Sequence, residues 1–178
     1  MFGNLNSKAF KVLNLFLDNP EKSFHLRKIA RLLKIAPATS KAALDELKKA
    51  GLIIEQRVAN LRLFSADREN ESFRQLKRLK NIEWLKNKKF LKRIMDENAI
   101  SVVLFGSYAI GTNTKESDMD LLILVKARAQ IKIKEFNGIE LQIIQKTPAE
   151  LRELEKSNNS FYREIISTGI ALYGRMPA

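Results

Sequence analysis

Two aspartates, Asp118 and Asp120, are separated by one residue and stand directly before an apolar run, Leu121 to Val125. The run has the length and composition of a buried β-strand, and side chains alternate between the two faces of a strand. Both carboxylates are therefore predicted to lie on one face. Because like charges repel unless a cation lies between them, and because Mg²⁺ prefers carboxylate oxygens, we expect Asp118 and Asp120 to be metal ligands.

A glycine and a serine, Gly106 and Ser107, precede the aspartates and follow another apolar run, Val102 to Phe105. A short buried strand that ends at a glycine fits this pattern. The turn would expose backbone N–H groups and a hydroxyl, and a short helix after it would point its N-terminus at a phosphate. A phosphate site that faces a metal site predicts phosphoryl or nucleotidyl transfer. The alternative is a hairpin-like turn in which Asp118 is an ordinary loop residue.

The segment from Gly106-Ser107 through Gly111-Thr112 to Asp118-Met119-Asp120 resembles the signature of the DNA polymerase β-type nucleotidyltransferase superfamily, particularly its minimal branch. The resemblance covers residues 99–178. It implies that two Mg²⁺ ions are held by Asp118 and Asp120, and that Gly106 and Ser107 hold the phosphates of an NTP, expected to be ATP. It further implies that NMP, expected to be AMP, passes to a protein or RNA acceptor.

The chain departs from this family pattern at two positions. Relatives normally carry a third acid on a neighbouring strand, where it helps to deprotonate the acceptor. Counting back from Thr147-Pro148, that position falls on Gln142, which cannot act as a base. Glu140, two residues earlier on the same strand face, is the candidate catalytic substitute, and the alternative is an ordinary solvent-facing residue. Ile110 stands where many relatives carry a basic residue, so a potential phosphate ligand is missing.

The composition predicts the class of protein and its compartment. The chain has 178 residues and no cysteine, which excludes disulfides and thiolate zinc sites. The N-terminal sequence lacks the order of a signal peptide, and no apolar run approaches the length of a membrane span, so we expect a cytoplasmic protein. The net charge is +12, of which +7 falls on residues 1–66, +4 on residues 67–100 and +1 on residues 101–178. A basic first half favours contact with nucleic acid, or else a well-solvated surface.

Residues 1–66 show three helical patterns and a small hairpin, and the stretch Leu26 to Ile53 resembles a winged helix-turn-helix domain. Ser23 is a plausible N-cap for the second helix, and Pro37 suits the first position of the third. The resemblance implies that the third helix enters the major groove of double-stranded DNA and that the wing meets phosphates or the minor groove. The residues implied to contact DNA are Ala38, Thr39, Ser40, Lys41, Arg57 and Arg62. The alternative is a winged helix that serves only for packing or dimerisation, and a homodimer is expected by analogy alone.

The predicted fold class is α+β, with three parts: a winged helix-turn-helix over residues 1–66, a connecting helix (or two) over 67–98, and a minimal nucleotidyltransferase domain with a mixed sheet over 99–178. Within the last part, Ile131 to Glu135 and Ile139 to Ile144 are predicted strands joined by a turn at Asn137-Gly138. A capping box starts a helix at Thr147. The last helix is expected to be lined by Phe161, Ile165, Thr168 and Leu172.

Two functional hypotheses follow. The first is a Mg²⁺-dependent nucleotidyltransferase tethered to DNA. Members of the branch that it resembles often act as antitoxins, paired with small helical RNase toxins that they adenylylate, so the resemblance implies a toxin-like protein partner or an RNA. The second is a DNA-binding regulator whose transferase domain senses nucleotide or is catalytically inactive. Asp118 and Asp120 favour the first hypothesis, whereas Gln142 and Ile110 favour the second.

Overall fold

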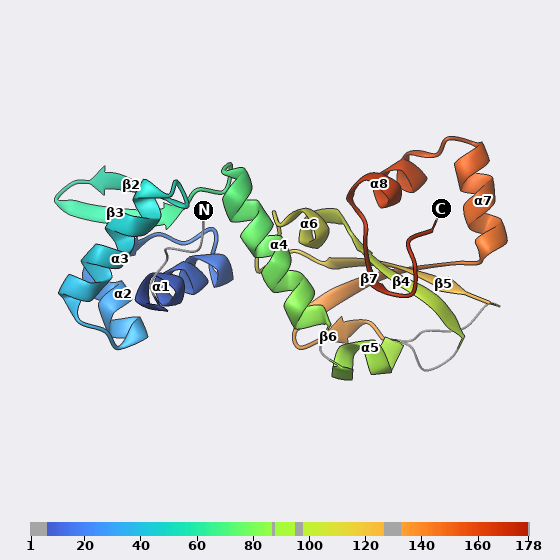
Figure 1. Cartoon of the computed structure of the whole chain (residues 1–178), viewed down its shortest axis with the longest axis horizontal. Coiled ribbons are helices and arrows are strands. Elements are labelled where there is room, and N and C mark those ends of the chain that lie inside the picture. Colours follow the sequence, from blue (N-terminus) through green and yellow to red (C-terminus); the bar gives the residue numbers. More distant parts are fainter. Residues whose placement is uncertain (1–6, 87, 95–97, 127–132, 178) are drawn as a thin grey trace. The chain divides into compact units, whose positions relative to one another are not determined.

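The computed structural model describes residues 7–86, 88–94, 98–126 and 133–177 (Figure 1). The chain divides into two compact units, Met1–Leu76 and Lys77–Ala178, and each is described by itself. Within the described ranges, no helix is both long enough and apolar enough to cross a membrane.

Unit 1 is built from helices and short strands in the order α1 (Ser7–Asp18), β1 (Phe24–His25), α2 (Leu26–Leu33), α3 (Pro37–Lys49), β2 (Ile53–Val58) and β3 (Leu61–Ala66). The strands form an antiparallel sheet in the order β1-β3-β2. The helices and strands share one core, in which Phe16 of α1, Leu44 of α3 and Phe64 of β3 are buried. This order of helices and strands confirms the predicted winged helix-turn-helix fold.

Local signals explain the boundaries of these helices. Pro37 opens α3 as predicted, because its fixed φ and missing N–H suit the first helical turn. Lys34 adopts the left-handed conformation at the end of α2 and so redirects the chain into α3. The prediction of Ser23 as the N-cap of α2 is wrong, because the N-cap is His25, whose Nδ1 accepts a hydrogen bond from the Lys28 amide at 3.2 Å.

The middle of the chain contains two helices, α4 (Glu71–Leu85) and α5 (Lys88–Ile94). The side chain of Asn70 accepts a hydrogen bond from the amide of Phe73 and so caps the start of α4. The boundary between the two units falls within α4: Phe73 belongs to the core of unit 1, and Leu85 belongs to the core of unit 2.

Unit 2 continues with β4 (Ala99–Phe105), α6 (Gly106–Ile110), β5 (Met119–Val125), β6 (Glu135–Phe136), β7 (Ile139–Lys146), α7 (Pro148–Lys156), α8 (Ser160–Thr168) and β8 (Ile170–Tyr173). The sheet order is β6-β7-β5-β4-β8. The β5–β7 pair is parallel and the others are antiparallel, which confirms the predicted mixed sheet.

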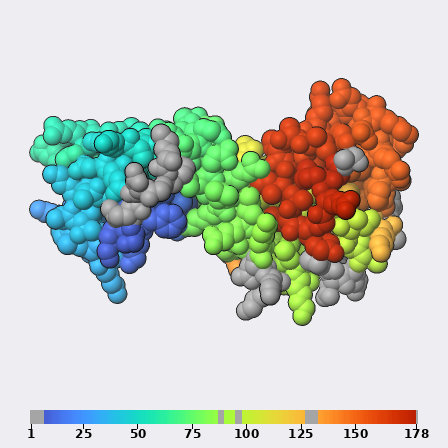
Figure 2. All heavy atoms as spheres, in the orientation of Figure 1, coloured from blue at the N-terminus to red at the C-terminus, as the bar shows by residue number. Residues whose placement is uncertain are grey.

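Both faces of this sheet are covered. Leu104 and Ile123 point to a core shared with Leu85 of α4 and Phe90 of α5. The alternate residues of the same strands point to a second core beneath α7 and α8, which contact each other. Figure 2 shows the orange and red atoms of the last part of the chain side by side at the surface of unit 2. Because β4 and β5 are buried on both faces, their sequences are continuously apolar rather than alternating.

Three predicted features of unit 2 can be compared with the structure. The Asn137-Gly138 turn is confirmed, since both residues have the positive φ that a tight hairpin requires. The strand predicted over Ile131 to Glu135 is wrong at positions 133 and 134, which precede β6 (Glu135–Phe136); positions 131 and 132 lie outside the described residues. The last helix ends at Thr168, so Leu172 does not belong to it but to β8, which pairs with β4.

Candidate active site and DNA interface

The Gly-Ser turn and the two aspartates meet at one end of the sheet in unit 2. Asp118 directly precedes β5, and Asp120 pairs with Phe105, the last residue of β4. Gly106 follows Phe105 and begins α6 with φ +64°. A Cβ at Gly106 would lie 2.3 Å from Oδ2 of Asp120. Only a glycine therefore allows the turn to approach this carboxylate so closely.

The third position of the site holds an amide. Gln142 of β7 is the register partner of Asp120 in the parallel pair, and its Nε2 lies 3.4 Å from Oδ2 of Asp118. Glu140, the residue predicted to replace the missing acid, pairs with Glu135 of β6 and is exposed. Among the described residues, no three His, Cys, Asp or Glu side chains form a group that could hold a metal ion. Asp118 and Asp120 are thus two acids accompanied by an amide donor.

The electrostatics of the site are those of acids without a partner cation. The pKa of Asp120 is raised above its ordinary value, first by burial, then by the negative charge of Glu164 and then by that of Asp118. In the part of the chain that the structure describes, no lysine or arginine forms an ion pair with Asp118 or Asp120. A cation bound at the two aspartates would offset this repulsion between like charges.

Glu164 is the acid near this site that sequence reasoning missed. It lies on α8, whose Phe161 contacts Phe105 edge-to-face with ring centroids 5.5 Å apart, and whose Ile165 is buried in the same core. Since Phe105 is the register partner of Asp120, this packing brings α8 towards the aspartates. No local motif marks Glu164, because its proximity depends on how a helix more than 40 residues further along the chain packs on the sheet.

In unit 1, the residues predicted to contact DNA lie in different environments. Ala38 and Lys41 at the start of α3 are exposed, and Thr39 is half-buried. Ser40 is fully buried, which corrects the prediction that it faces the bases. The reason is helical periodicity: Ser40 stands three, four and seven residues before Ala43, Leu44 and Leu47, which form the buried face of α3.

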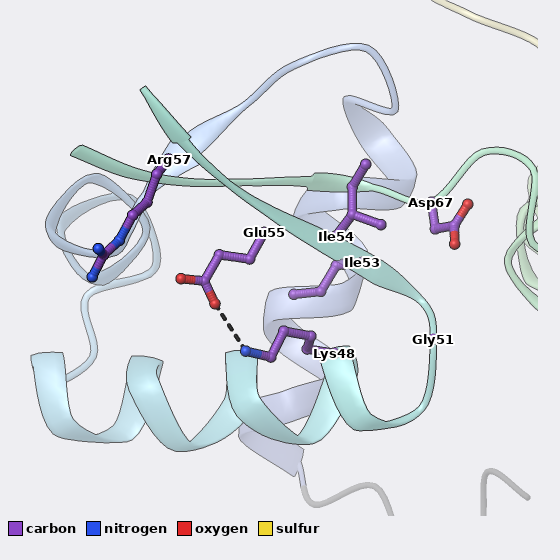
Figure 3. Close-up of a pocket in the computed structure, with 7 residues that line it drawn as sticks. All are labelled: Lys48, Gly51, Ile53, Ile54, Glu55, Arg57 and Asp67. Carbon is purple, nitrogen blue, oxygen red and sulfur yellow. Dashed lines mark hydrogen bonds and ion pairs between the residues drawn. The ribbon is translucent and has the colours of Figure 1, made fainter. Parts of the chain in front are cut away.

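The two arginines of the wing also differ. Arg57 and Arg62 are register partners on β2 and β3, and both are exposed. Arg62, however, donates from Nε to the carboxylate of Glu55, which also accepts a hydrogen bond from Lys48 of α3 at 2.8 Å. Lys48, Glu55 and Arg57 line a cavity of about 500 Å³ between α3 and β2. Figure 3 shows the side chain of Lys48 pointing towards the carboxylate of Glu55. Arg62 is therefore partly occupied by an internal ion pair, whereas Arg57 has no such carboxylate partner among the described residues.

A comparison with protein families bears directly on unit 2. The sequence model of the family described as "Polymerase beta, Nucleotidyltransferase" matches residues 86–178, just over half of the chain. The chain belongs to this nucleotidyltransferase family. The match includes the Gly-Ser turn, both aspartates and Gln142.

A curated relative lies within the same class. The chain is 46% identical over 48 residues to a Methanocaldococcus jannaschii protein named "Putative protein adenylyltransferase MJ0141". The aligned region is 27% of this chain and 48% of that protein, so the chain spans about half the length of the relative.

Two solved structures align with the chain at low scores. The transcriptional regulator BldR from Sulfolobus solfataricus is 18% identical, with a TM-score of 0.36 over 53% of this chain and 70% of that chain. A mutant of Lactococcus lactis ZitR in complex with DNA is 25% identical, with a TM-score of 0.31 over 48% of this chain and 72% of that chain. The assignment of a winged-helix fold to unit 1 therefore rests on its own order of helices and strands.

Proposed function

We propose that this protein is a Mg²⁺-dependent nucleotidyltransferase that moves NMP from an NTP to a protein or RNA acceptor, and that its winged helix binds double-stranded DNA. The observation that carries the proposal is the close approach of the Gly106 turn to the carboxylate of Asp120, which feels the charge of Asp118 and forms no ion pair among the described residues. A relative named "Putative protein adenylyltransferase" supports ATP as the NTP and a protein as the acceptor. A toxin-like protein as that acceptor is part of the proposal. A homodimer and a cytoplasmic location belong to the same proposal.

The residues present fit a divalent metal. Asp118 and Asp120 supply hard oxygen ligands, and the absence of a side chain at Gly106 allows the carboxylate of Asp120 to lie against the turn. Bound Mg²⁺ would neutralise charge on the triphosphate and favour in-line displacement. Gly106 and Ser107 would hold the phosphates of the nucleotide.

The transfer itself exchanges one bond to phosphorus for another. The oxygen of an acceptor hydroxyl bonds to the α-phosphorus, while the bond from that phosphorus to the bridging oxygen breaks and pyrophosphate leaves. The hydroxyl proton needs a base, and Glu140 is the candidate that we propose. Gln142 cannot take a proton, so it would instead orient Asp118 through its amide.

A second candidate function is a DNA-binding regulator whose transferase domain binds nucleotide without turning it over. Two observations favour it: the amide of Gln142 beside Asp118, and the apolar, exposed side chain of Ile110. Both candidates require a metal-dependent nucleotide site, and they differ in whether a transferred NMP can be found.

The deciding experiment is calorimetric binding of ATP and GTP with Mg²⁺ to the intact protein and to an Asp118→Asn, Asp120→Asn double mutant. We expect metal-dependent binding that the double mutant loses. Glu153→Gln is the matched control, because it removes an exposed acid elsewhere in unit 2 and should leave binding unchanged. If the intact protein binds neither nucleotide, the proposal is wrong. If binding is found, transfer of α-labelled AMP to candidate acceptors separates the enzyme from the sensor.

DNA binding is tested by fluorescence anisotropy on a duplex over a range of salt concentrations. For the proposed contacts we retain Ala38, Thr39, Lys41 and Arg57, with Arg62 engaged by Glu55 as described above. Removing one side chain that neutralises a phosphate should reduce the slope of log K against log salt by about 0.9, so Arg57→Ala should lower the slope by roughly this amount. Lys156→Ala, which removes an exposed cation of unit 2, is the control. An affinity that does not respond to salt would contradict an electrostatic DNA interface.

A further inference from the structure

A buried polar network lies under the loop that joins the Gly-Ser turn to Asp118. Its centre is Asn81 of α4, which is 7% exposed. The Nδ2 of Asn81 donates to the backbone carbonyl of Tyr108 at 2.9 Å and to Oδ1 of Asn113 at 2.7 Å. Asn113 is 3% exposed, and its side chain acts on the hydroxyl of Tyr108, whose pKa it lowers against the larger effect of burial. One amide thus joins helix α4 to α6 and to the loop that follows it.

The rest of this loop is held by short-range hydrogen bonds. The amides of Gly111 and Thr112 both donate to the carbonyl of Ser107 at 3.0 Å, which closes the end of α6. Nearer to Asp118, the amide of Thr114 donates to the hydroxyl of Ser117 at 2.9 Å. Asn113 lies between these two closed turns. Asn81 therefore anchors the middle of the loop, at Asn113, which neither of these two local turns includes.

Burial makes this anchor costly to remove. Without the amide of Asn81, the carbonyl of Tyr108 and the side chain of Asn113 lack a donor in a site from which water is largely excluded. A buried polar group that loses its partner destabilises the local arrangement far more than an exposed one does. The cheapest relief is for the loop to move outward and hydrate, and such movement would displace the residues at its two ends.

We propose that Asn81 is a positioning residue of the nucleotide site, holding the loop of residues 111–117 so that Ser107 and Asp118 keep their relative places. This inference rests on the proposed function above. It also means that the nucleotide site depends on a residue outside the family match, since Asn81 lies before residues 86–178. The part of α4 from Lys77 onward belongs to unit 2, so the family match is shorter than the structure that supports the site.

The test uses the full chain with Asn81→Ala and two readouts: amide hydrogen exchange and calorimetric binding of Mg²⁺-ATP. We expect faster exchange across residues 111–118, unchanged exchange in β7, and binding weaker by about tenfold or more. Gln75→Ala is the matched control, because Gln75 is an exposed amide on the same helix. The fluorescence of Trp84, the only tryptophan in the chain, reports whether unit 2 remains folded.

A milder variant, Tyr108→Phe, keeps the proposal testable if Asn81→Ala unfolds the unit. Tyr108→Phe removes only the hydroxyl, so exchange of the loop should increase less but in the same direction. Asn113→Ala should resemble Asn81→Ala, and the double mutant should add little, because both variants break one network.

The outcomes separate this inference from the proposed function. Faster loop exchange together with weaker binding supports both. Faster loop exchange in a protein whose intact form binds no nucleotide supports the anchoring role and contradicts the transferase proposal. Unchanged loop exchange in a folded Asn81→Ala variant, or full retention of Mg²⁺-ATP binding, overturns the positioning role of Asn81.

Discussion

Glu55 on the wing and Asp120 at the end of the unit 2 sheet are carboxylates in opposite surroundings. Glu55 accepts hydrogen bonds from Arg62 and Lys48, in that order of effect, and its pKa falls to about 2. Asp120 is partly buried near Glu164 and Asp118, and its pKa is raised. The first carboxylate has its cations supplied by the protein, whereas the second has only other acids near it in the described part of the chain.

The difference shows how a structural acid can be told from a candidate functional acid. An acid with internal partners is satisfied when the chain folds, so it needs no ligand. An acid held among like charges is unfavourable in the folded protein unless something positive binds there. Asp120 is therefore the one that we expect to respond to metal and nucleotide, and Glu55 the one that we expect to respond only to changes in its own ion pairs.

The largest effect should come from placing a side chain on Gly106. Gly106→Ala combines left-handed backbone strain with a Cβ that collides with the carboxylate of Asp120. We expect Mg²⁺-ATP binding to weaken by more than about tenfold, because the carboxylate must move away from its place. Gly138→Ala is the matched control: its φ is +79° and nothing lies within 4 Å of the added Cβ, so it carries the backbone strain alone. Equal losses in the two variants would show that strain, and not the collision, matters.

Asp120→Asn should have opposite effects with and without ligand. Because the folded pKa of Asp120 lies above its ordinary value of 3.8, its contribution to stability is full below that pH and is lost as pH rises through the folded value. In a chelator at neutral pH, Asp120→Asn should therefore stabilise the protein, by no more than about 1 kcal/mol since the carboxyl is partly screened by solvent. Thermal unfolding measures this. With Mg²⁺-ATP present, wild type should instead be more stable than Asp120→Asn. If Asp120→Asn is less stable than wild type under both conditions, the comparison is contradicted.

Glu55→Gln should increase DNA affinity modestly. The substitution removes one negative charge from the wing and releases Arg62 and Lys48 from their shared carboxylate. We expect a gain of about two- to threefold at low salt that shrinks as salt is added. Anisotropy titrations of Glu55→Gln and of Glu21→Gln, which changes an exposed acid of the same unit, measure the difference. A loss of affinity in Glu55→Gln would mean that the ion pairs hold the wing in its binding shape.

The smallest effect concerns acid stability. The pKa of Glu55 is lowered from 4.5 to about 2, so its ion pairs stabilise the fold above pH 4.5 and are lost as pH falls through about 2. Wild type should be slightly more stable than Glu55→Gln at neutral pH, and the two should converge towards pH 2. Denaturant unfolding of both proteins over this pH range measures the gap, which should be small because such pairs are near solvent. A gap that stays constant with pH would show that Glu55 acts through packing.

The sequence by itself determined the parts of the molecule that depend on short spacing. The spacing of two between Asp118 and Asp120 places both acids on one face at the start of a strand. The glycine after the strand Val102–Phe105 indicates a turn beside them. The Asn137-Gly138 hairpin and the Thr147 capping box are equally local, and the structure contains both. Even Ser40 could have been assigned correctly, because its spacing to Leu44 and Leu47 already indicates the buried face of α3.

Only the tertiary structure decided which distant residues join these local pieces. Glu164 approaches Asp120, Asn81 anchors the loop at Asn113, and Lys48 reaches Glu55 because separate helices pack against sheets or loops. The final apolar segment shows the same limit, since Leu172 fits a helical pattern but lies in a strand that pairs with β4. Spacing along a strand or helix follows from backbone geometry, whereas these contacts depend on how whole elements pack. No short pattern in the sequence records that packing.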